Sequence, residues 1–220
     1  MADFKLPNNT QRLAVIGRTG SGKTQFAAWA LSTSSFTSQP WVIVDYKYDP
    51  LLNGISRIEE LDLKDRLPRK PGLYIIHPRP VADDEAVEEW LLRVWEHERI
   101  GLYVDEAYML PNAAGLRGIL TQCRSRRIPA IVLAQRPSWI SKFILSESEY
   151  LAIFHLQSRR DAQTVEQVLP IGALKRRLPA YCCHWYDVAQ NVLFDLQPVP
   201  EADVITEMID SRLRPKSRWG

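Results

Sequence analysis

The segment GRTGSGKT, residues 17–24, follows the apolar run LAVI directly and precedes QFAAWALS. It fits the pattern G-x-x-x-x-G-K-[ST] between a strand and a helix, which is the context that this pattern requires. Glycines let such a loop curl so that successive backbone N–H groups point inward, and the next helix presents its positive N-terminal end. The segment therefore predicts a strand–loop–helix unit that holds phosphate groups; a glycine-rich turn that binds nothing is the alternative.

The side chains of this loop suit a nucleoside triphosphate. We expect Lys23 to reach the β- and γ-phosphates and the Thr24 hydroxyl to ligate Mg²⁺, so ATP and Mg²⁺ are the expected cofactors. The residues expected to contact the nucleotide are Gly17, Thr19, Gly20, Ser21, Gly22, Lys23, Thr24 and Gln25.

Length, charge and cysteine content limit the class of protein. A chain of 220 residues, 45% of them hydrophobic, suits one compact domain with a sizeable core. Its net charge of +2 is too small to indicate nucleic-acid binding, so any contact with a polyanion must be local. Three cysteines without metal-ligand spacing predict a reduced, intracellular protein without structural metal. We also expect no membrane insertion, since no apolar run approaches about 18 residues.

Short apolar runs alternate with polar or helical segments along the first 135 residues. The runs RLAVI, WVIVD, LYIIH, IGLYVD and AIVLAQ predict a parallel sheet covered by helices on both faces. Further on, we expect a polar helix over 161–169 and a hairpin formed by YCCHWYD and NVLFDLQ. We expect the tryptophans to lie in the core and the basic tail from Ser211 to be frayed. The predicted organisation is a single domain over 1–200, followed by a C-terminal helix and basic tail over 201–220.

Two strands of this sheet end in polar side chains suited to hydrolysis. The run IGLYVD ends in Asp105, which would hold the Mg²⁺ shell, and Glu106 would orient and polarise the attacking water. Solvated acids at the end of an ordinary strand are the alternative. The run AIVLAQ ends in Gln135, whose amide could sense the γ-phosphate or could belong to a loop without function.

Three motifs taken together resemble those of the FtsK/HerA superfamily of DNA-pumping ATPases. They are GRTGSGKT, LYVDEAY and CRSRRIPAIVLAQRPS, and the similarity covers most of residues 12–170. The resemblance implies a RecA-like P-loop ATPase fold of the ASCE type, with a central, mostly parallel α/β sheet flanked by helices and a C-terminal β-hairpin.

Within that superfamily, the chain looks most like the genome-packaging ATPases of tailless, membrane-containing phages such as tectiviruses. This narrower resemblance implies an ATP-driven translocase that moves double-stranded DNA, regardless of sequence, into a preformed capsid. It further implies a homo-oligomeric ring, usually a hexamer, with capsid or portal vertex proteins as partners. The expected location is the cytoplasm of the infected host cell and the packaging vertex.

The resemblance also gives roles to several basic residues. Arg124 opens the family-like turn and is the preferred arginine finger toward the γ-phosphate of a neighbouring subunit. Arg127 stands where the family often has glycine, so the finger remains open between these two residues; a solvated basic turn or a DNA-facing patch is the alternative. Asp45 and Lys47 resemble a D-x-K segment near the nucleotide or the ring interface, although Asp45 fits a strand-end cap equally well. Arg79 in HPRP fits an exposed turn better than a DNA contact.

Two other functions fit a P-loop in a chain of this size. One is a conjugation or filament-extrusion motor of the same superfamily, which membrane helices or a long extra domain would favour. The other is a small-molecule kinase, which would need an acceptor pocket and an arginine-rich lid. The paired acids and the strand that ends in glutamine favour ATP hydrolysis over transfer to a small molecule.

Overall fold

The computed structural model describes residues 4–110, 114–140 and 142–213. Its strands are β1 (Arg12–Ile16), β2 (Pro40–Val44), β3 (Glu59–Glu60), β4 (Gly72–Ile76), β5 (Gly101–Val104), β6 (Ala130–Ala134), β7 (Tyr150–Ile153), β8 (Cys183–Asp187) and β9 (Val192–Leu196). Its α-helices are α1 (Lys23–Ser32), α2 (Pro50–Asn53), α3 (Asp84–His97), α4 (Ala114–Arg126), α5 (Lys142–Ser146), α6 (Arg159–Glu166) and α7 (Ala202–Leu213). Short 3-10 turns are η1 (Ala107–Met109) and η2 (Ala173–Lys175).

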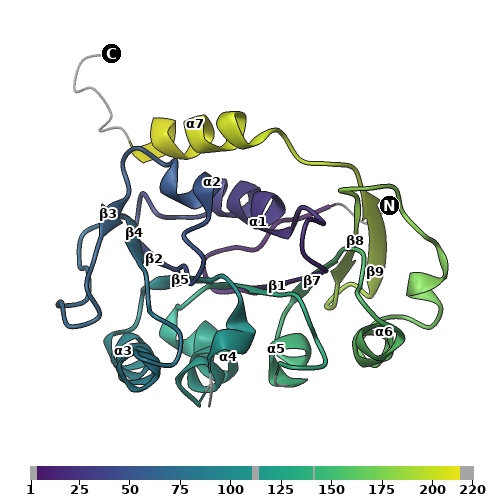
Figure 1. Ribbon diagram of the computed structural model, residues 1–220, viewed down its shortest axis with the longest axis horizontal. Coiled ribbons are helices and arrows are strands. Elements are labelled where there is room, and N and C mark those ends of the chain that lie inside the picture. The colour runs from purple at the N-terminus through teal and green to yellow at the C-terminus, as the bar shows by residue number, and fades with distance from the viewer. Residues whose placement is uncertain (1–3, 111–113, 141, 214–220) are drawn as a thin grey trace.

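In the described part of the chain, all nine strands form one sheet in the order β3-β4-β2-β5-β6-β1-β7-β8-β9 (Figure 1). In this spatial order, all neighbouring strands from β3 as far as β7 pair in parallel, and β8 and β9 join antiparallel at one edge. This arrangement confirms the predicted α/β fold with a mostly parallel sheet and a C-terminal hairpin. Parallel strands bring their carboxyl ends to one edge, which is where ligands bind in open α/β sheets.

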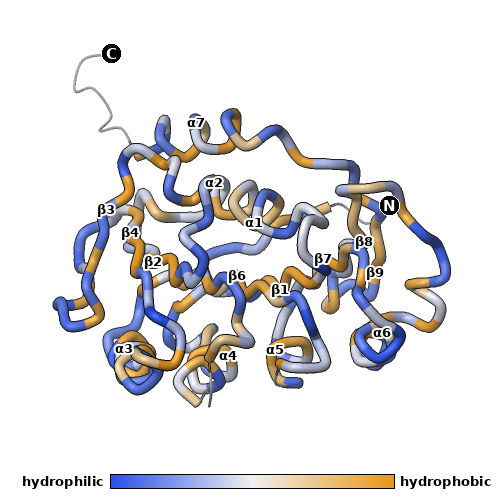
Figure 2. Tube along the Cα trace, in the orientation of Figure 1, coloured by the Kyte–Doolittle hydropathy of each residue, from blue (hydrophilic) through white to orange (hydrophobic). Residues whose placement is uncertain are grey.

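Helices cover both faces of the sheet. Helices α1, α2 and α7 lie on one face, and α3, α4, α5 and α6 lie on the other (Figure 1). Because side chains alternate along a strand, β1 supplies Leu13 and Val15 to one core and Ala14 and Ile16 to the other. The central strands appear as apolar segments between the two helical layers in Figure 2. The two cores fix the strand ends, and with them the loops that carry the polar side chains.

Two expectations about the C-terminal part of the chain need correction. The polar helix begins at Arg159, because Ser158 caps it by accepting a hydrogen bond from the Asp161 N–H. It ends at Glu166. The tail is not frayed over residues 211–213, since these belong to α7, which buries Ile205 and Ile209 against the core around α1. Residues 214–220 lie outside the described ranges.

The tryptophans do not all lie in the core. Trp90 and Trp185 are fully buried, as expected, but Trp139 is 62% exposed beside the carboxyl end of β6. The guanidinium of Arg136 covers its ring, at 4.5 Å from the ring centroid. Trp219 falls outside the described residues. Trp139 shows that an aromatic residue in a loop without helical or strand periodicity cannot be assigned to the core from its type alone.

In the described ranges, every helix is too short or too polar to cross a lipid bilayer.

Candidate active site

The phosphate loop over residues 17–22 connects β1 to α1 at the carboxyl edge of the sheet. Neighbouring strands hold its start on both sides: the Gly17 N–H donates to the Ala134 carbonyl at 3.2 Å, and the Arg18 N–H donates to the His155 carbonyl at 2.8 Å. The loop is therefore fixed to the ends of the strands that flank β1. His155 also donates from Nε2 to the Leu178 carbonyl at 2.9 Å, so its side chain has a structural role.

Two glycines of this loop have steric reasons to be glycine. A Cβ on Gly17 would lie 2.5 Å from the Phe154 Cβ and 2.8 Å from the Ser21 Oγ, closer than van der Waals contact allows. Gly22 has φ 97°, a left-handed conformation that side chains other than glycine rarely adopt. It is the N-cap of α1 and offers no side chain to the first N–H groups of that helix. The helix N-terminus therefore remains available for an anion.

A cavity of about 760 Å³ lies over the loop and the start of α1. Of the residues predicted to contact the nucleotide, those that line this cavity are Thr19, Gly20, Gly22, Lys23, Thr24 and Gln25. Gly17 and Ser21 are absent from its lining, and Ser21 is buried. The far wall comes from Lys47, Asp49 and the start of α7. Lys23 is 5% exposed, and burial lowers the pKa of its ammonium group.

Asp105 follows β5 and is buried, with 1% of the residue exposed. Neither of its carboxylate oxygens has a hydrogen-bond partner among the described residues. Desolvation, followed by the charge of Glu106, raises the pKa of Asp105 to about 7. A buried carboxylate without partners is costly unless a cation neutralises it, so this donor fits a metal ion.

Glu106 lies at the centre of a polar cluster and is fully buried. Its Oε1 accepts a hydrogen bond from the Gln135 Nε2 at 2.5 Å and one from the Lys47 ammonium, and the Lys23 Nζ lies 3.9 Å away. The Gln135 Oε1 accepts in turn from the Thr19 hydroxyl at 2.8 Å. The structure thus connects the phosphate loop, the end of β6 and Glu106 through one chain of hydrogen bonds.

Two residues of the segment after β2 have different roles: Asp45 stabilises the segment, and Lys47 belongs to the candidate active site. Asp45 accepts from the backbone N–H of Lys47 at 3.0 Å and from that of Asp49 at 2.9 Å, which fits the strand-end cap. The Lys47 side chain reaches Glu106. Sequence reasoning placed Lys47 near the nucleotide or the ring interface and missed this partner. To predict the contact between Lys47 and Glu106, one must know the order of the strands, because it depends on β2 lying beside β5 in the sheet.

The three arginines around the end of α4 lie far from this site in their own chain. Helix α4 leads into the amino end of β6, the edge opposite to the phosphate loop. Arg124 has a 78% exposed side chain, 3.9 Å from the Glu149 carboxylate. Arg126 donates to the Trp95 carbonyl at 2.9 Å and lies over the Trp95 ring. Arg127 has φ 54°, which explains why glycine suits this position.

Two further arginines have carboxylate partners. Arg79 forms an ion pair with Asp83 at 2.8 Å at the start of α3, which fits the exposed turn rather than a DNA contact. Arg136 donates to the buried Asp161 at 3.0 Å and so connects the segment after β6 to α6. Sequence reasoning missed this second pair, because its residues are 25 positions apart and no local pattern joins them.

A phosphate loop with a buried lysine, an acid pair and a strand-end glutamine at one edge of a parallel sheet defines a P-loop nucleoside-triphosphate-binding protein. No family model matches the sequence. The chain is 40% identical over 217 residues to the DNA packaging ATPase P9 of Enterobacteria phage PRD1, covering 94% of this chain and 95% of P9.

Solved structures share the fold at low sequence identity. The genome packaging NTPase B204 from Sulfolobus turreted icosahedral virus 2, in complex with AMPPCP, matches 88% of this chain and 100% of its own at 16% identity and a TM-score of 0.69. EssC (ATPases 2 and 3) from Geobacillus thermodenitrificans matches 93% of this chain and 43% of its own at 13% identity and a TM-score of 0.61.

The chain therefore belongs to the family of the DNA packaging ATPase P9 of the phage PRD1. This membership confirms the resemblance predicted from the three motifs and their order.

Proposed function

We propose that this chain is an ATPase that moves double-stranded DNA into a viral capsid. The 40% identity to P9, which extends over 94% of this chain, supports the packaging role. The observation that carries the ATPase chemistry is the buried Glu106, which lies beside the phosphate cavity with Lys23, Lys47 and Gln135 around it.

The geometry supports hydrolysis by a water molecule that Glu106 orients. Glu106 Oε1 is occupied by Lys47 and Gln135, whereas Oε2 has no partner among the described residues, so Oε2 is the atom that would accept a proton from water. The water oxygen bonds to the γ-phosphorus as the bond from phosphorus to the β–γ bridging oxygen breaks, leaving ADP and inorganic phosphate. Lys23 stabilises the charge on the phosphates.

Mg²⁺ would be held by the Thr24 hydroxyl and the Asp105 carboxylate, and would neutralise phosphate charge when bound. Asp105 fits this role because it is buried and has no other partner among the described residues. Gln135 would report the γ-phosphate to Glu106, since its amide already connects Glu106 with Thr19 of the loop.

A homo-oligomeric ring, expected to be a hexamer, would complete this site with Arg124 from a neighbouring subunit. Two observations support Arg124: its side chain is exposed, and it lies at the sheet edge opposite to its own phosphate loop, so it can act only on another subunit. Arg126 is less suited, because Trp95 and Glu98 already engage its guanidinium. A guanidinium at the γ-phosphate is worth about 10³ to 10⁵ in rate.

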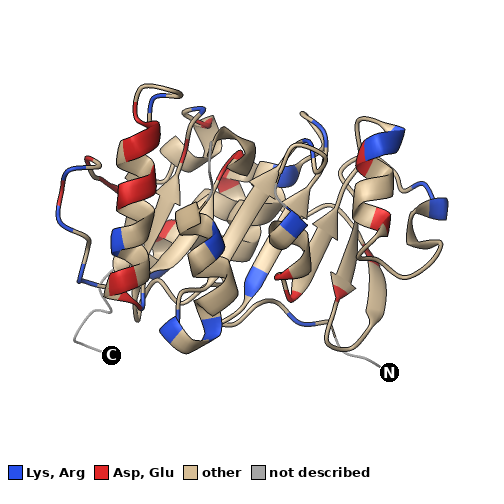
Figure 3. Cartoon of the chain, turned by 90° about the horizontal axis from the view of Figure 1, so that it is seen from below, with Lys and Arg blue, Asp and Glu red and all other residues tan. Residues whose placement is uncertain are grey.

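The DNA contact would be made to phosphates, because a pump must grip every base step alike. The outer surface of α3 is a poor candidate, since acidic residues outnumber basic ones in this helix and lie along its length (Figure 3). Capsid or portal vertex proteins would be the other partners, in the host cytoplasm and at the packaging vertex.

Helix α7 would belong to the ATPase domain, because it shares a core with α1.

Turnover of ATP with and without duplex DNA tests this function. We expect hydrolysis that duplex DNA stimulates and that Glu106→Gln removes. A kinase would instead place phosphate on an added nucleoside, and that result would overturn the proposal. Hydrolysis indifferent to duplex DNA across a range of salt concentrations would remove the translocase role.

A further inference from the structure

A hollow of about 360 Å³ adjoins the phosphate cavity. The two cavities share Gly22, Gln25 and Tyr181, but Lys23 and Thr24 line only the larger one. A triphosphate extended along the loop has its γ-phosphate near Lys23 and its nucleoside end beyond Gly22 and Gln25. The smaller hollow therefore lies where the nucleoside would leave the phosphate cavity.

Tyr181 forms one wall of this hollow in an unusual conformation. Its backbone has φ 62°, which is uncommon for a bulky residue, and the residue is 59% exposed. Its ring lies close to the loop, with the Cδ1 atom 3.2 Å from where a Cβ on Gly22 would stand. Folding alone does not favour a strained backbone that presents an aromatic ring to solvent, and such strain concentrates at ligand sites.

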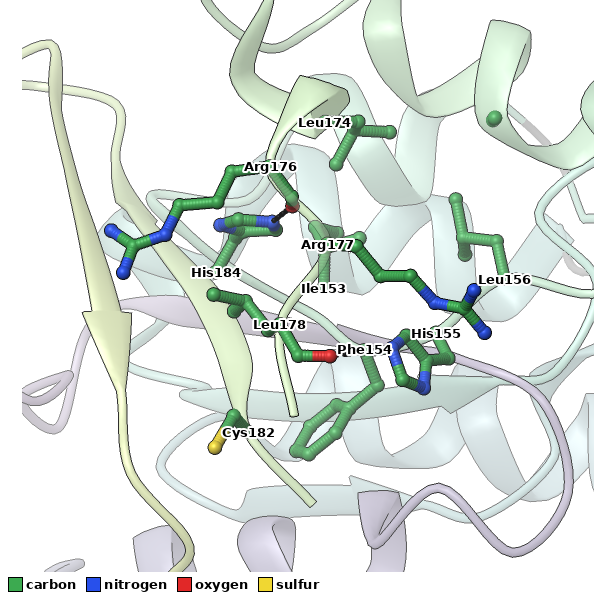
Figure 4. A pocket seen from close by; sticks show the side chains of 11 residues that line it. Ile153, Phe154, His155, Leu156, Leu174, Arg176, Arg177, Leu178, Cys182 and His184 are labelled. Atoms are coloured by element: carbon green, nitrogen blue, oxygen red, sulfur yellow. Dashed lines mark hydrogen bonds between the residues drawn. The ribbon is translucent and has the colours of Figure 1, made fainter. Parts of the chain in front are cut away.

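Hydrogen bonds from two histidines hold the segment that precedes Tyr181 in place. Figure 4 shows the neighbouring cavity, in which His184 and His155 contact the segment that precedes Tyr181. His184 Nε2 donates to the Arg176 carbonyl at 3.1 Å, and His155 Nε2 donates to the Leu178 carbonyl at 2.9 Å. The side chains of Arg176 and Arg177 point to opposite sides of this cavity (Figure 4). Tyr181 therefore follows an anchored segment.

Apolar residues form the floor of the hollow and part of its walls, and Gln25 and Glu201 also line it. Pro198 and Val199, from the connection between β9 and α7, line it opposite α1, and Phe26 of α1 is 2% exposed beneath it. The Gln25 Nε2 donates to the Pro200 carbonyl at 2.7 Å, which ties this connection to the start of α1. An aromatic ring, a proline and a valine around an apolar floor suit a flat heterocycle better than a phosphate or a sugar.

We propose that Tyr181 and the Pro198–Val199 segment form the nucleobase subsite, in which the Tyr181 ring stacks on the base of the bound nucleotide. This inference rests on the proposed ATPase function and names a residue outside the phosphate loop that selects a nucleotide over a bare polyphosphate.

The test compares the affinity for ATP with that for inorganic tripolyphosphate, measured by calorimetry on the full chain in the Glu106→Gln background. We expect Tyr181→Ala to weaken ATP binding about tenfold and to leave tripolyphosphate binding unchanged, because stacking on one base is worth roughly that factor. Tyr181→Phe keeps the ring and is expected to bind ATP like the parent.

Tyr48→Ala is the matched control, since Tyr48 is also an exposed tyrosine with positive φ but lines neither cavity. We expect it to leave both affinities unchanged. Unchanged ATP affinity in Tyr181→Ala, or an equal loss for both ligands, would overturn the subsite while leaving the ATPase function intact. A parent chain that binds neither ligand would overturn the proposed function itself.

Discussion

The two edges of the sheet are built in opposite ways. At the carboxyl edge, Lys23, Asp105 and Glu106 are at most 5% exposed and come from segments far apart in the chain. At the amino edge, Arg124 is 78% exposed, and its nearest ion-pair partner is 3.9 Å away. Buried groups are positioned by their own chain before the reaction begins, whereas an exposed arginine is free to meet another molecule. This difference agrees with the proposal that the carboxyl edge binds the nucleotide and that the amino edge contacts the next subunit.

The largest effect expected at the carboxyl edge is that of Glu106→Gln. The amide cannot accept a proton from water, so we expect kcat to fall about 10⁴-fold while the Kd for ATP stays within about twofold. Turnover and equilibrium binding measure the two quantities. Glu166→Gln, on the exposed surface of α6, is the matched control and should leave both unchanged. Full turnover by Glu106→Gln would contradict the site.

Arg124→Ala tests the amino edge. We expect it to lower kcat about 10³-fold without changing ATP affinity, because the guanidinium acts only on the transition state of the neighbour. Arg126→Ala should behave differently: it loses its bond to the Trp95 carbonyl and its contact with the ring, so the melting temperature falls while turnover persists. If Arg126→Ala abolished turnover while Arg124→Ala left it unchanged, Arg126 would be the arginine finger.

Gln135→Ala breaks the chain of hydrogen bonds that joins Glu106 to Thr19 of the phosphate loop. We expect a loss of about 10² in kcat, since Glu106 loses both its positioning partner and its connection to the loop. Thr19→Val removes only the bond to Gln135 and should cost about threefold. Single-turnover kinetics measure both variants. Equal losses would show that Gln135 acts entirely through its bond to Thr19, and an unchanged kcat in Gln135→Ala would contradict a role for Gln135 in positioning Glu106.

The buried carboxylate predicts a pH dependence of stability. Because the pKa of Asp105 is raised to about 7 in the fold, the stability that its neutral form gives is present at low pH and is lost as pH rises through 7. In EDTA at pH 8, Asp105→Asn should therefore be more stable than the parent by about 2 kcal/mol. Thermal melts at pH 8 and pH 5 should show a smaller gain at pH 5. Equal gains at both pH values would contradict this account.

The smallest effect is expected at Arg127. A left-handed backbone disfavours arginine and permits glycine, so Arg127→Gly should stabilise the fold by about 0.5 kcal/mol. Denaturant melts measure the change. We expect turnover to stay at the parent level, and a large loss of turnover would instead make Arg127 the finger.

Sequence reasoning reached the parts of this molecule that local patterns determine. The loop around Lys23, the acids after β5 and Gln135 after β6 all stand at strand ends, so their meeting at one edge follows from a parallel sheet. The contact between Lys47 and Glu106 depends on β2 lying beside β5, which no short motif encodes. Tyr181 was missed for another reason: its position depends on a left-handed backbone in a loop held by His155 and His184.

Mixing two inactive variants tests the central claim, that each active site takes Glu106 from one subunit and Arg124 from the next. Glu106→Gln and Arg124→Ala are each expected to be inactive alone. In an equal mixture, about a quarter of the interfaces combine an intact Glu106 with an intact Arg124, so turnover of ATP in the presence of duplex DNA should return to a comparable fraction of the parent rate. A mixture that stays as inactive as its components, although the subunits exchange, would contradict a site shared between neighbours.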